Sequence, residues 1–220
     1  MAMEQQMYDS IDTAGRILRA AEKLFAEQGF KGTTMRQITT EADVNLAAVN
    51  YHFGSKTGLI HAVAGHTLEP LCQDIEAALA EHGRTEVVPL GPLLNILASA
   101  LVRIHQSNPY ALSVLMRCLE QAYRPNQAEL QAFLLNTYGA RLHHFLQHLR
   151  HGSGVEGESE FFWRLHFLLG SVVFTLSNLH ALVALDAESD SDETALEPVL
   201  RRLVPVLTAG MQAPVQRELS

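Results

Sequence analysis

The stretch NLAAVNYHFGSK, residues 45–56, places a short helix, a turn and the start of another helix within twelve residues. Asn45 is a favoured N-cap, and the segment from Leu46 to about His52 continues with apolar and small residues at helical spacing. Lys56 stands where the next helix begins, and the N-terminus of a helix attracts anions such as phosphate. The stretch therefore has the form of a helix that reads DNA, followed by a segment that holds the DNA backbone.

Another helix is predicted directly before this stretch. Thr34 and Gln37 have the spacing of a capping box, in which each side chain accepts a hydrogen bond from the backbone N–H of the other. A helix should therefore begin near Met35, with Ile38 and Ala42 on one apolar face. Residues 43–45 would form the turn of a helix-turn-helix.

The side chains of this helix-turn-helix suit DNA in different ways. The N-terminal part of the second helix meets base edges in this motif, while flanking elements hold phosphates. Asn50 can form a bidentate pair with adenine, and Tyr51 and His52 can donate to phosphate. The alternative is an ordinary pair of core-packing helices, because caps of this kind are common. The expected DNA-binding residues are Thr33, Thr34, Arg36, Gln37, Asn45, Leu46, Ala47, Ala48, Asn50, Tyr51, His52 and Lys56.

Four short motifs occur together between Ile11 and Ile60, namely FAEQGF, GTTMRQIT, ADVN and YHFGSK. As a set they resemble the DNA-binding domain of TetR/AcrR-family repressors, and AAVNYHFGSK is further similar to the PsrA-like, fatty-acid-responsive branch. The resemblance implies a homodimer that binds a palindromic operator, with a C-terminal domain that binds an effector. The chain departs from the family at Asp43, where glycine is common, and this affects both the turn and the charge near DNA.

The residues beyond 60 show the apolar spacing of helices and no alternation typical of strands. We therefore predict an all-α protein of about nine helices. Residues 1–60 form the DNA-binding domain, with 1–11 as a disordered lead-in, and 61–220 form a helical bundle for ligand binding and dimerisation. Gly29 should close the first helix, and Pro70 should kink the fourth. Further helices are predicted over 90–106, 109–122, 126–150, 159–185 and 193–211.

Composition is typical of an intracellular globular protein, with 47% hydrophobic and 18% charged residues. The net charge of −8 argues against a strongly basic DNA-binding surface, yet residues 1–60 carry six Lys/Arg and seven Asp/Glu, so most of the negative charge lies elsewhere. Local contacts, rather than bulk charge, would then supply the affinity for phosphate. Cys72 and Cys118 are expected to be reduced and buried, and a cytoplasmic location is expected.

The segment 161–185 is long and apolar enough to suggest a membrane span, but it contains Arg164. Placing an arginine in hydrocarbon costs about 2.5 kcal/mol or more, so a buried helix is favoured and no membrane partner is expected. Together with the last helix it would form a four-helix interface between two subunits. The expected interface residues are Phe162, Leu169, Val173, Leu176, His180, Leu196, Leu200, Leu203 and Leu207.

A helical bundle can also enclose a cavity for a hydrophobic effector. Arg103 and Arg141 are candidates for binding an acidic head group, although arginine lies more often at the surface and each apolar candidate is more often simple core. A fatty acid or its coenzyme A thioester is the first expected effector, and this follows only from the PsrA-like resemblance. The candidate ligand-binding residues are Leu97, Leu101, Arg103, Ile104, Leu115, Leu119, Phe133, Tyr138, Arg141, Phe145 and Phe174.

Two other hypotheses remain open. The four residues His143, His144, His148 and His151 have a spacing compatible with metal ligation, which would make the chain a metal-responsive sensor. No carboxylate or cysteine lies among them, so neither a metal site nor a cofactor is assigned. The other hypothesis is a helical enzyme or acyl carrier with a vestigial DNA module. The sequence lacks motifs such as G-x-S-x-G or H-E-x-x-H, so an enzyme is not expected.

Overall fold

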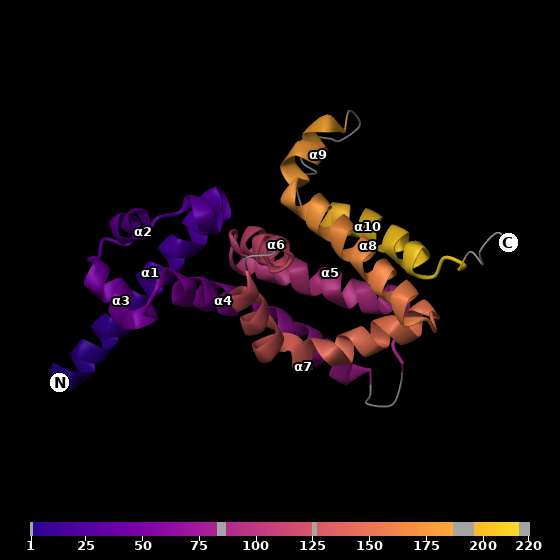
Figure 1. Cartoon of the computed structure of the whole chain (residues 1–220), viewed down its shortest axis with the longest axis horizontal. Helices are drawn as coiled ribbons and strands as arrows, with labels where there is room; N and C mark the ends of the chain where they lie inside the picture. The colour runs from indigo at the N-terminus through magenta and orange to yellow at the C-terminus, as the bar shows by residue number, and fades with distance from the viewer. Residues whose placement is uncertain (1, 83–86, 125–126, 187–195, 216–220) are drawn as a thin grey trace. The chain divides into compact units, whose positions relative to one another are not determined.

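The computed structural model describes residues 2–82, 87–124, 127–186 and 196–215. Every regular element in these ranges is an α-helix, which confirms the predicted all-α class (Figure 1). The helices are α1 (Ala2–Gly32), α2 (Met35–Glu41), α3 (Leu46–Phe53), α4 (Lys56–Glu81), α5 (Leu90–Ser107), α6 (Ala111–Ala122), α7 (Ala128–Ser153), α8 (Glu158–Ser177), α9 (Leu179–Leu185) and α10 (Leu196–Met211).

The described chain divides into two compact units that do not follow the predicted boundary at residue 60. The first unit contains Met1–Pro70 and Ser107–Phe133, and the second contains Leu71–Gln106 and Leu134–Ser220. The sequence-distant helix α6 therefore belongs to the same compact unit as α1, α2 and α3. Helix α1 begins at Ala2, so the segment expected to be a disordered lead-in is helical in the structure.

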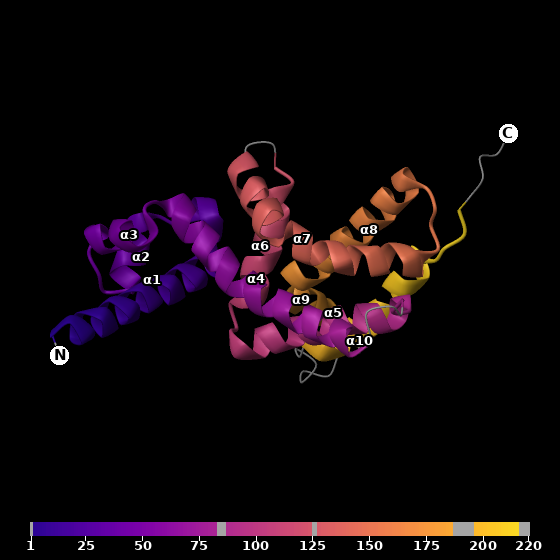
Figure 2. The same ribbon diagram turned by 90° about the horizontal axis from the view of Figure 1, so that it is seen from below.

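Helices α1, α2 and α3, which we call the head, pack around a small apolar core (Figures 1 and 2). The side chains of Ile17, Phe25, Ile38 and Val49 are fully buried there. Phe25 and Phe30 meet edge to face with ring centroids 5.1 Å apart, a favoured aromatic geometry. The apolar spacing seen in the sequence thus becomes the inner face of the head.

Helix α6 is joined to α1 by polar contacts as well as by packing. The backbone of α1 leaves helical geometry at Gly29, with φ 76°, close to where the sequence predicted its end. Arg117 of α6 donates to the Ala26 carbonyl from Nε at 3.1 Å and from Nη2 at 2.8 Å. These bonds occupy a backbone acceptor beside the break in the helix, so the guanidinium caps this end of α1.

A buried carboxylate makes a further link in the same unit. Glu22 of α1 is only 3% exposed, and its Oε2 accepts from Asn108 Nδ2 at 3.0 Å. Its Oε1 lies 2.5 Å from Nδ1 of His66 in α4. Three segments that are distant in sequence therefore meet at one acidic group, which satisfies the requirement that buried charge be hydrogen-bonded.

In the second unit, α8 and α10 lie side by side (Figure 1). Arg164 of α8 is 7% exposed, pairs with Glu160 at 2.7 Å and donates to the Met211 carbonyl at the end of α10 at 2.8 Å.

The predicted helix over 159–185 is divided in two by a 76° bend at Asn178. In the described ranges no single helix meets the length and apolarity of a membrane span, and only the bent α8–α9 pair does so together. Helix α4 continues through Pro70 to Glu81.

Candidate nucleic-acid interface

Helix α2 begins with the predicted capping box. The Gln37 backbone N–H donates to Thr34 Oγ1 at 3.2 Å, and the Thr34 backbone N–H donates to Gln37 Oε1 at 2.7 Å. Gln37 Nε2 also donates to Gln28 Oε1 of α1 at 2.9 Å. The Gln37 amide thus anchors α2 to α1, and its hydrogen-bonding groups are occupied within the head.

The turn between α2 and α3 depends on an unusual backbone conformation. Asp43 has φ 52°, and among the described residues it is the only non-glycine with a positive φ. Asn45 then caps α3, because its Oδ1 accepts from the Ala48 N–H at 2.8 Å. The predicted helix-turn-helix is confirmed. Asp43, which stands where glycine is common in the family, is also its one residue with a strained backbone.

Helix α3 has one exposed face and one buried face. Val49 is fully buried and fixes the helix on the head core. Leu46 is 51% exposed and Tyr51 is 82% exposed, and Ala47 and Asn50 are also exposed. Since residues i, i+1, i+4 and i+5 share one side of a helix, these four side chains form one surface, which we call the reading face.

The junction from α3 to α4 is unusually tight. Gly54 has φ 72°, and Ser55 Oγ accepts from the Gly58 N–H at 3.0 Å, which caps α4. An ideal Cβ on Gly58 would lie 2.1 Å from the Phe53 carbonyl oxygen. Only glycine fits at this position, and the close approach fixes the direction of α3 against the start of α4. Gly58 was not among the residues predicted from the sequence, although an isolated glycine within a helical pattern is a signal for a close approach of this kind.

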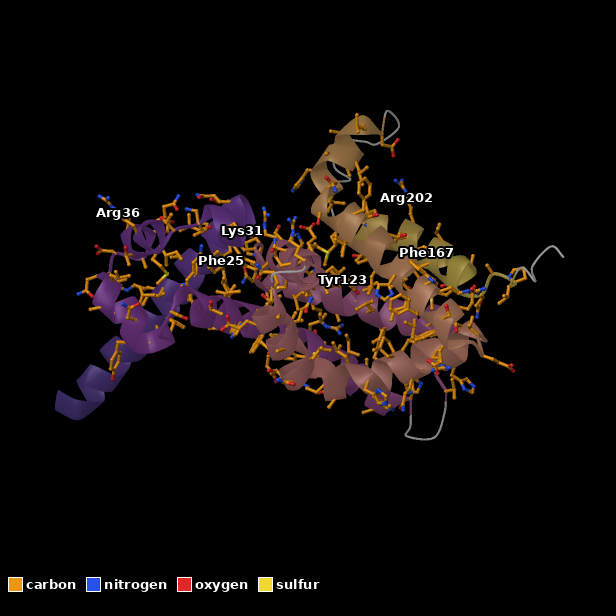
Figure 3. The ribbon with its side chains drawn as sticks, in the orientation of Figure 1. Phe25, Lys31, Arg36, Tyr123, Phe167 and Arg202 are labelled. Atoms are coloured by element: carbon orange, nitrogen blue, oxygen red, sulfur yellow. The ribbon has the colours of Figure 1, made fainter. Side chains whose placement is uncertain are left out.

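Three cations of the first unit, on α1, on α2 and at the start of α4, lack carboxylate partners. Within the described residues, Arg36, Lys31 and Lys56 form no ion pair. Figure 3 shows the Arg36 side chain extending away from α2. By contrast, Lys23 pairs with Glu41 at 2.7 Å, and the hydrogen bond from Lys23 to Glu41 raises the pKa of the lysine. The cations without carboxylate partners remain available for phosphate groups.

The twelve expected DNA-binding residues differ in how far their side chains are available to DNA. Thr33 is fully buried, and its hydroxyl donates to the Leu24 carbonyl at 3.1 Å and to the Gly29 carbonyl at 2.9 Å. Thr33 therefore stabilises the turn after α1 and is removed from the exposed set. Thr34, Gln37 and Asn45 are exposed but serve as caps. Ala48, His52 and Lys56 are half-buried, whereas Arg36, Leu46, Ala47, Asn50 and Tyr51 are exposed.

The residues expected to bind a ligand do not gather in one unit. Leu115, Leu119 and Phe133 belong to the first unit, and the others belong to the second. Most of the apolar ones are buried or half-buried, but Phe174 is 61% exposed.

Arg103 pairs with Asp74 at 2.7 Å. Arg141 holds Glu76 through two bonds of 2.7 and 2.8 Å, and this pairing lowers the pKa of Glu76. Leu97, Leu101, Ile104, Tyr138 and Phe145 are the remaining members of the second-unit group.

The residues expected at a subunit interface are also divided by exposure. Leu176, Leu196, Leu200 and Leu207 are each at most 8% exposed within the single chain, so they have little surface left for a partner. Phe162 is 51% exposed and His180 is exposed, while Leu169, Val173 and Leu203 are half-buried. Three further aromatic side chains of α8 are exposed, namely Trp163, Phe167 and Phe174. Trp163 and Phe167 are in neither predicted set, and Phe174 was expected to bind the ligand.

The histidine cluster favours a neutral ring at His148 over a metal site. The Val88 N–H donates to His148 Nδ1 at 3.3 Å, so in the neutral ring the proton must lie on Nε2. That Nε2 lies 3.3 Å from Nε2 of His144 and can donate to it, whereas a metal would require both atoms unprotonated. Across the described ranges no group of three or more His, Cys, Asp or Glu side chains could hold a metal ion.

Both cysteines are buried, as predicted. Burial raises the pKa of the Cys118 thiol to about 12, which keeps it protonated and unreactive at neutral pH.

Two family models match the chain. The model described as bacterial regulatory proteins, tetR family, matches residues 17–63, which include the head and the start of α4. The model described as the tetracyclin repressor-like C-terminal domain matches residues 95–210. The second match alone covers more than half of the chain, and the two matches do not overlap.

Curated relatives are similar over part of their length. The HTH-type transcriptional regulator BetI from Brucella anthropi is 33% identical over 127 residues, which are 58% of this chain and 61% of the relative. The probable HTH-type transcriptional regulator YttP from Bacillus subtilis is 35% identical over 68 residues, which are 31% of this chain and 33% of that protein. The chain thus spans between a third and about three fifths of the length of these two relatives.

Solved structures share the fold over almost the whole chain. The fatty acid degradation regulator FadR from Bacillus halodurans superposes with a TM-score of 0.63 at 16% identity, covering 90% of this chain and 95% of that one. The regulator PfmR from Thermus thermophilus gives a TM-score of 0.57 at 19% identity, covering 89% and 98%. At these identities the similarity establishes the fold.

Proposed function

Because the chain belongs to the TetR family of bacterial regulatory proteins, and so to DNA-binding transcriptional regulators rather than enzymes, we propose that it is a ligand-released repressor. As a homodimer in the cytoplasm it would bind a palindromic operator and dissociate when a hydrophobic small molecule binds its C-terminal domain. The observation that carries this proposal is the capped helix-turn-helix, which holds Asn50 and Tyr51 exposed on α3 with uncompensated cations nearby.

The proposed homodimer is supported by an exposed apolar surface on α8. Trp163 is 55%, Phe167 65% and Phe174 61% exposed, and Val206 on α10 is 67% exposed. Exposed aromatic side chains grouped on one helix are typical of a protein interface. Helices α8 and α10 pack against one another, and the buried residues Leu176 and Leu200 on them belong to the core beneath this surface.

The proposed effector is a fatty acid or an acyl-coenzyme A thioester. Leu101, Ile104 and Phe145 of the second unit are buried and apolar, and Tyr138 is a buried aromatic residue, in keeping with the mostly apolar and aromatic lining of a ligand site. The effector must bind the DNA-free conformation more tightly, because equal affinity for both conformations releases nothing. Helix α6 and the head belong to one compact unit, so a displacement of α6 would also move the head.

The test is a DNA-binding titration with the full chain. A fragment from upstream of the neighbouring genes should be bound specifically, and an acyl ligand should release it while a metal chelator should not. Lys56→Ala should weaken binding to all sequences and reduce the salt slope by about one, as expected for one lost phosphate contact. Release by chelator alone would instead support the metal-sensor hypothesis, and no specific binding at low salt would refute the proposal.

A further inference from the structure

The reading face of α3 is apolar at its N-terminal end, the part of a recognition helix that contacts base edges in the major groove. Leu46 is the first residue of the helix, and its side chain is 51% exposed. Between residues 12 and 70 of the described chain it is the only exposed leucine, isoleucine or valine. Ala47 beside it is exposed and also carries no hydrogen-bonding group.

The polar residues near Leu46 are largely committed to the head. Asn45 Oδ1 caps α3, and the Thr34 and Gln37 side chains bind one another. Base-specific hydrogen bonds from side chains of the reading face therefore fall to Asn50 and Tyr51. Leu46 and Ala47, the other two residues of the reading face, can recognise a base only by apolar contact. In the major groove the apolar group that distinguishes one base from the others is the 5-methyl group of thymine.

We propose that Leu46 determines specificity by packing on the 5-methyl group of a thymine in each operator half-site. The small side chain of Ala47 would let the helix approach the floor of the groove closely. This inference rests on the proposed DNA-binding function and adds the chemical group that is read. A leucine at this place also disfavours cytosine, because its side chain cannot accept from the cytosine amino group.

Replacing thymine by deoxyuridine in a bound operator tests the proposal, since this change removes only the methyl group. At one or two positions in each half-site the affinity should fall about fourfold, the effect expected for one buried methyl group. For Leu46→Ala the same replacement should have no effect at those positions. Leu46→Met retains an apolar side chain of similar reach and should keep most of the sensitivity. A cytosine at the position should bind better when it is 5-methylated.

The control is Leu135→Ala, which removes the same atoms from a leucine that is 70% exposed on α7. This variant should retain the full deoxyuridine penalty. A wild-type protein that binds its operator specifically but tolerates deoxyuridine at every position would overturn the inference and leave the proposed function intact. A penalty that persists unchanged in Leu46→Ala would assign the methyl contact to another residue. Absence of any specific operator would instead be a failure of the proposed function itself.

Discussion

At the scale of single residues, the turn of the helix-turn-helix retains a strained backbone. Asp43 occupies the left-handed region, which costs an L-residue about 1–2 kcal/mol, although the short polar side chain of aspartate tolerates it better than most. The exposed carboxylate also stands beside Asn45 at the start of α3, where phosphate would approach. Asp43 therefore lowers the stability of the turn through its strained backbone, and its negative charge opposes the approach of phosphate.

Replacing Asp43 by glycine should therefore improve both properties. Asp43→Gly is expected to raise the free energy of unfolding by about 0.5–1 kcal/mol, since relief of the strain exceeds the entropic cost of glycine. It should also tighten DNA binding at low salt. Asp43→Asn, which removes the charge but retains a residue tolerated in this conformation, should tighten DNA binding without stabilising the fold. Denaturant unfolding and a binding titration distinguish the two effects, and equal stability of Asp43→Gly and wild type would contradict the strain argument.

Gly58 has the opposite character, because no larger residue fits. In Gly58→Ala the new Cβ would meet the Phe53 carbonyl, and a backbone atom cannot move aside as a side chain can. We expect a loss of about 2–3 kcal/mol in unfolding free energy, together with weakened DNA binding. Gly139→Ala is the matched control, because nothing lies within 4 Å of its Cβ and α7 is helical there, so stability should rise by up to about 1 kcal/mol. Thermal unfolding of both variants checks the contrast.

At the scale of elements, the contact between α1 and α6 is the best-defined link from the head to the rest of the first unit. Arg117→Met retains the aliphatic stem but removes the bonds to the Ala26 carbonyl. Hydrogen bonds from a charged group contribute about 1.5–3 kcal/mol, so the variant should unfold at lower denaturant concentration. Hydrogen exchange should accelerate at the C-terminal end of α1, and release of DNA by the effector should be reduced. Arg124→Met, which changes an exposed arginine just after α6, should resemble wild type in all three measurements.

The exposed aromatic side chains of α8 give the second prediction at this scale. Phe167→Glu places a charge on the proposed subunit interface and should convert a dimer into a monomer in sedimentation experiments, with loss of operator binding. Leu135→Glu introduces the same charge at an equally exposed position on α7. It should remain dimeric, and a Phe167→Glu variant that stays dimeric would exclude Phe167 from the interface.

The elements that could be predicted from the sequence were those fixed by local chemistry. The caps at Thr34 and Asn45 depend on neighbours three residues away, so the start of α2 and of α3 was predicted correctly. The bend at Asn178 was not predicted, because the apolar pattern continues on both sides of it. There the Asn178 side chain donates to the Phe174 carbonyl at 2.8 Å, and the chain turns by 76°. The association of α6 with the head depends on contacts about 90 residues apart in sequence, for which one chain carries no pattern.

At the scale of the whole molecule, His148 should make stability depend on pH. Its burial, helped by the neighbouring His144, His151 and His82, lowers its pKa. As the pH falls below about 6.5, the unfolded chain takes up the proton before the folded one does. Stability should therefore decrease as the pH falls from about 6.5 through the lowered pKa of the folded state. Protonation would also remove the acceptor for the Val88 N–H.

The variant His148→Gln should flatten this part of the stability profile, because a glutamine oxygen can still accept from Val88 but does not titrate. His143→Gln changes an exposed histidine on the same helix and should retain the slope of the wild type. Unfolding free energies measured at pH 7, 6 and 5 provide the comparison. An identical slope for wild type and His148→Gln would show that the pH dependence has another origin.

The close approach at Gly58 also bears on how the DNA specificity of such proteins could be re-engineered. A transplanted recognition helix keeps its orientation only if the acceptor scaffold has room for the carbonyl at position 53. Residues 45–58 therefore form the smallest cassette that can be exchanged as a unit, from the cap of α3 to the glycine on which it rests. A chimera that moves α3 alone onto a scaffold with a bulkier residue at that place would inherit the new side chains but present them at a different angle.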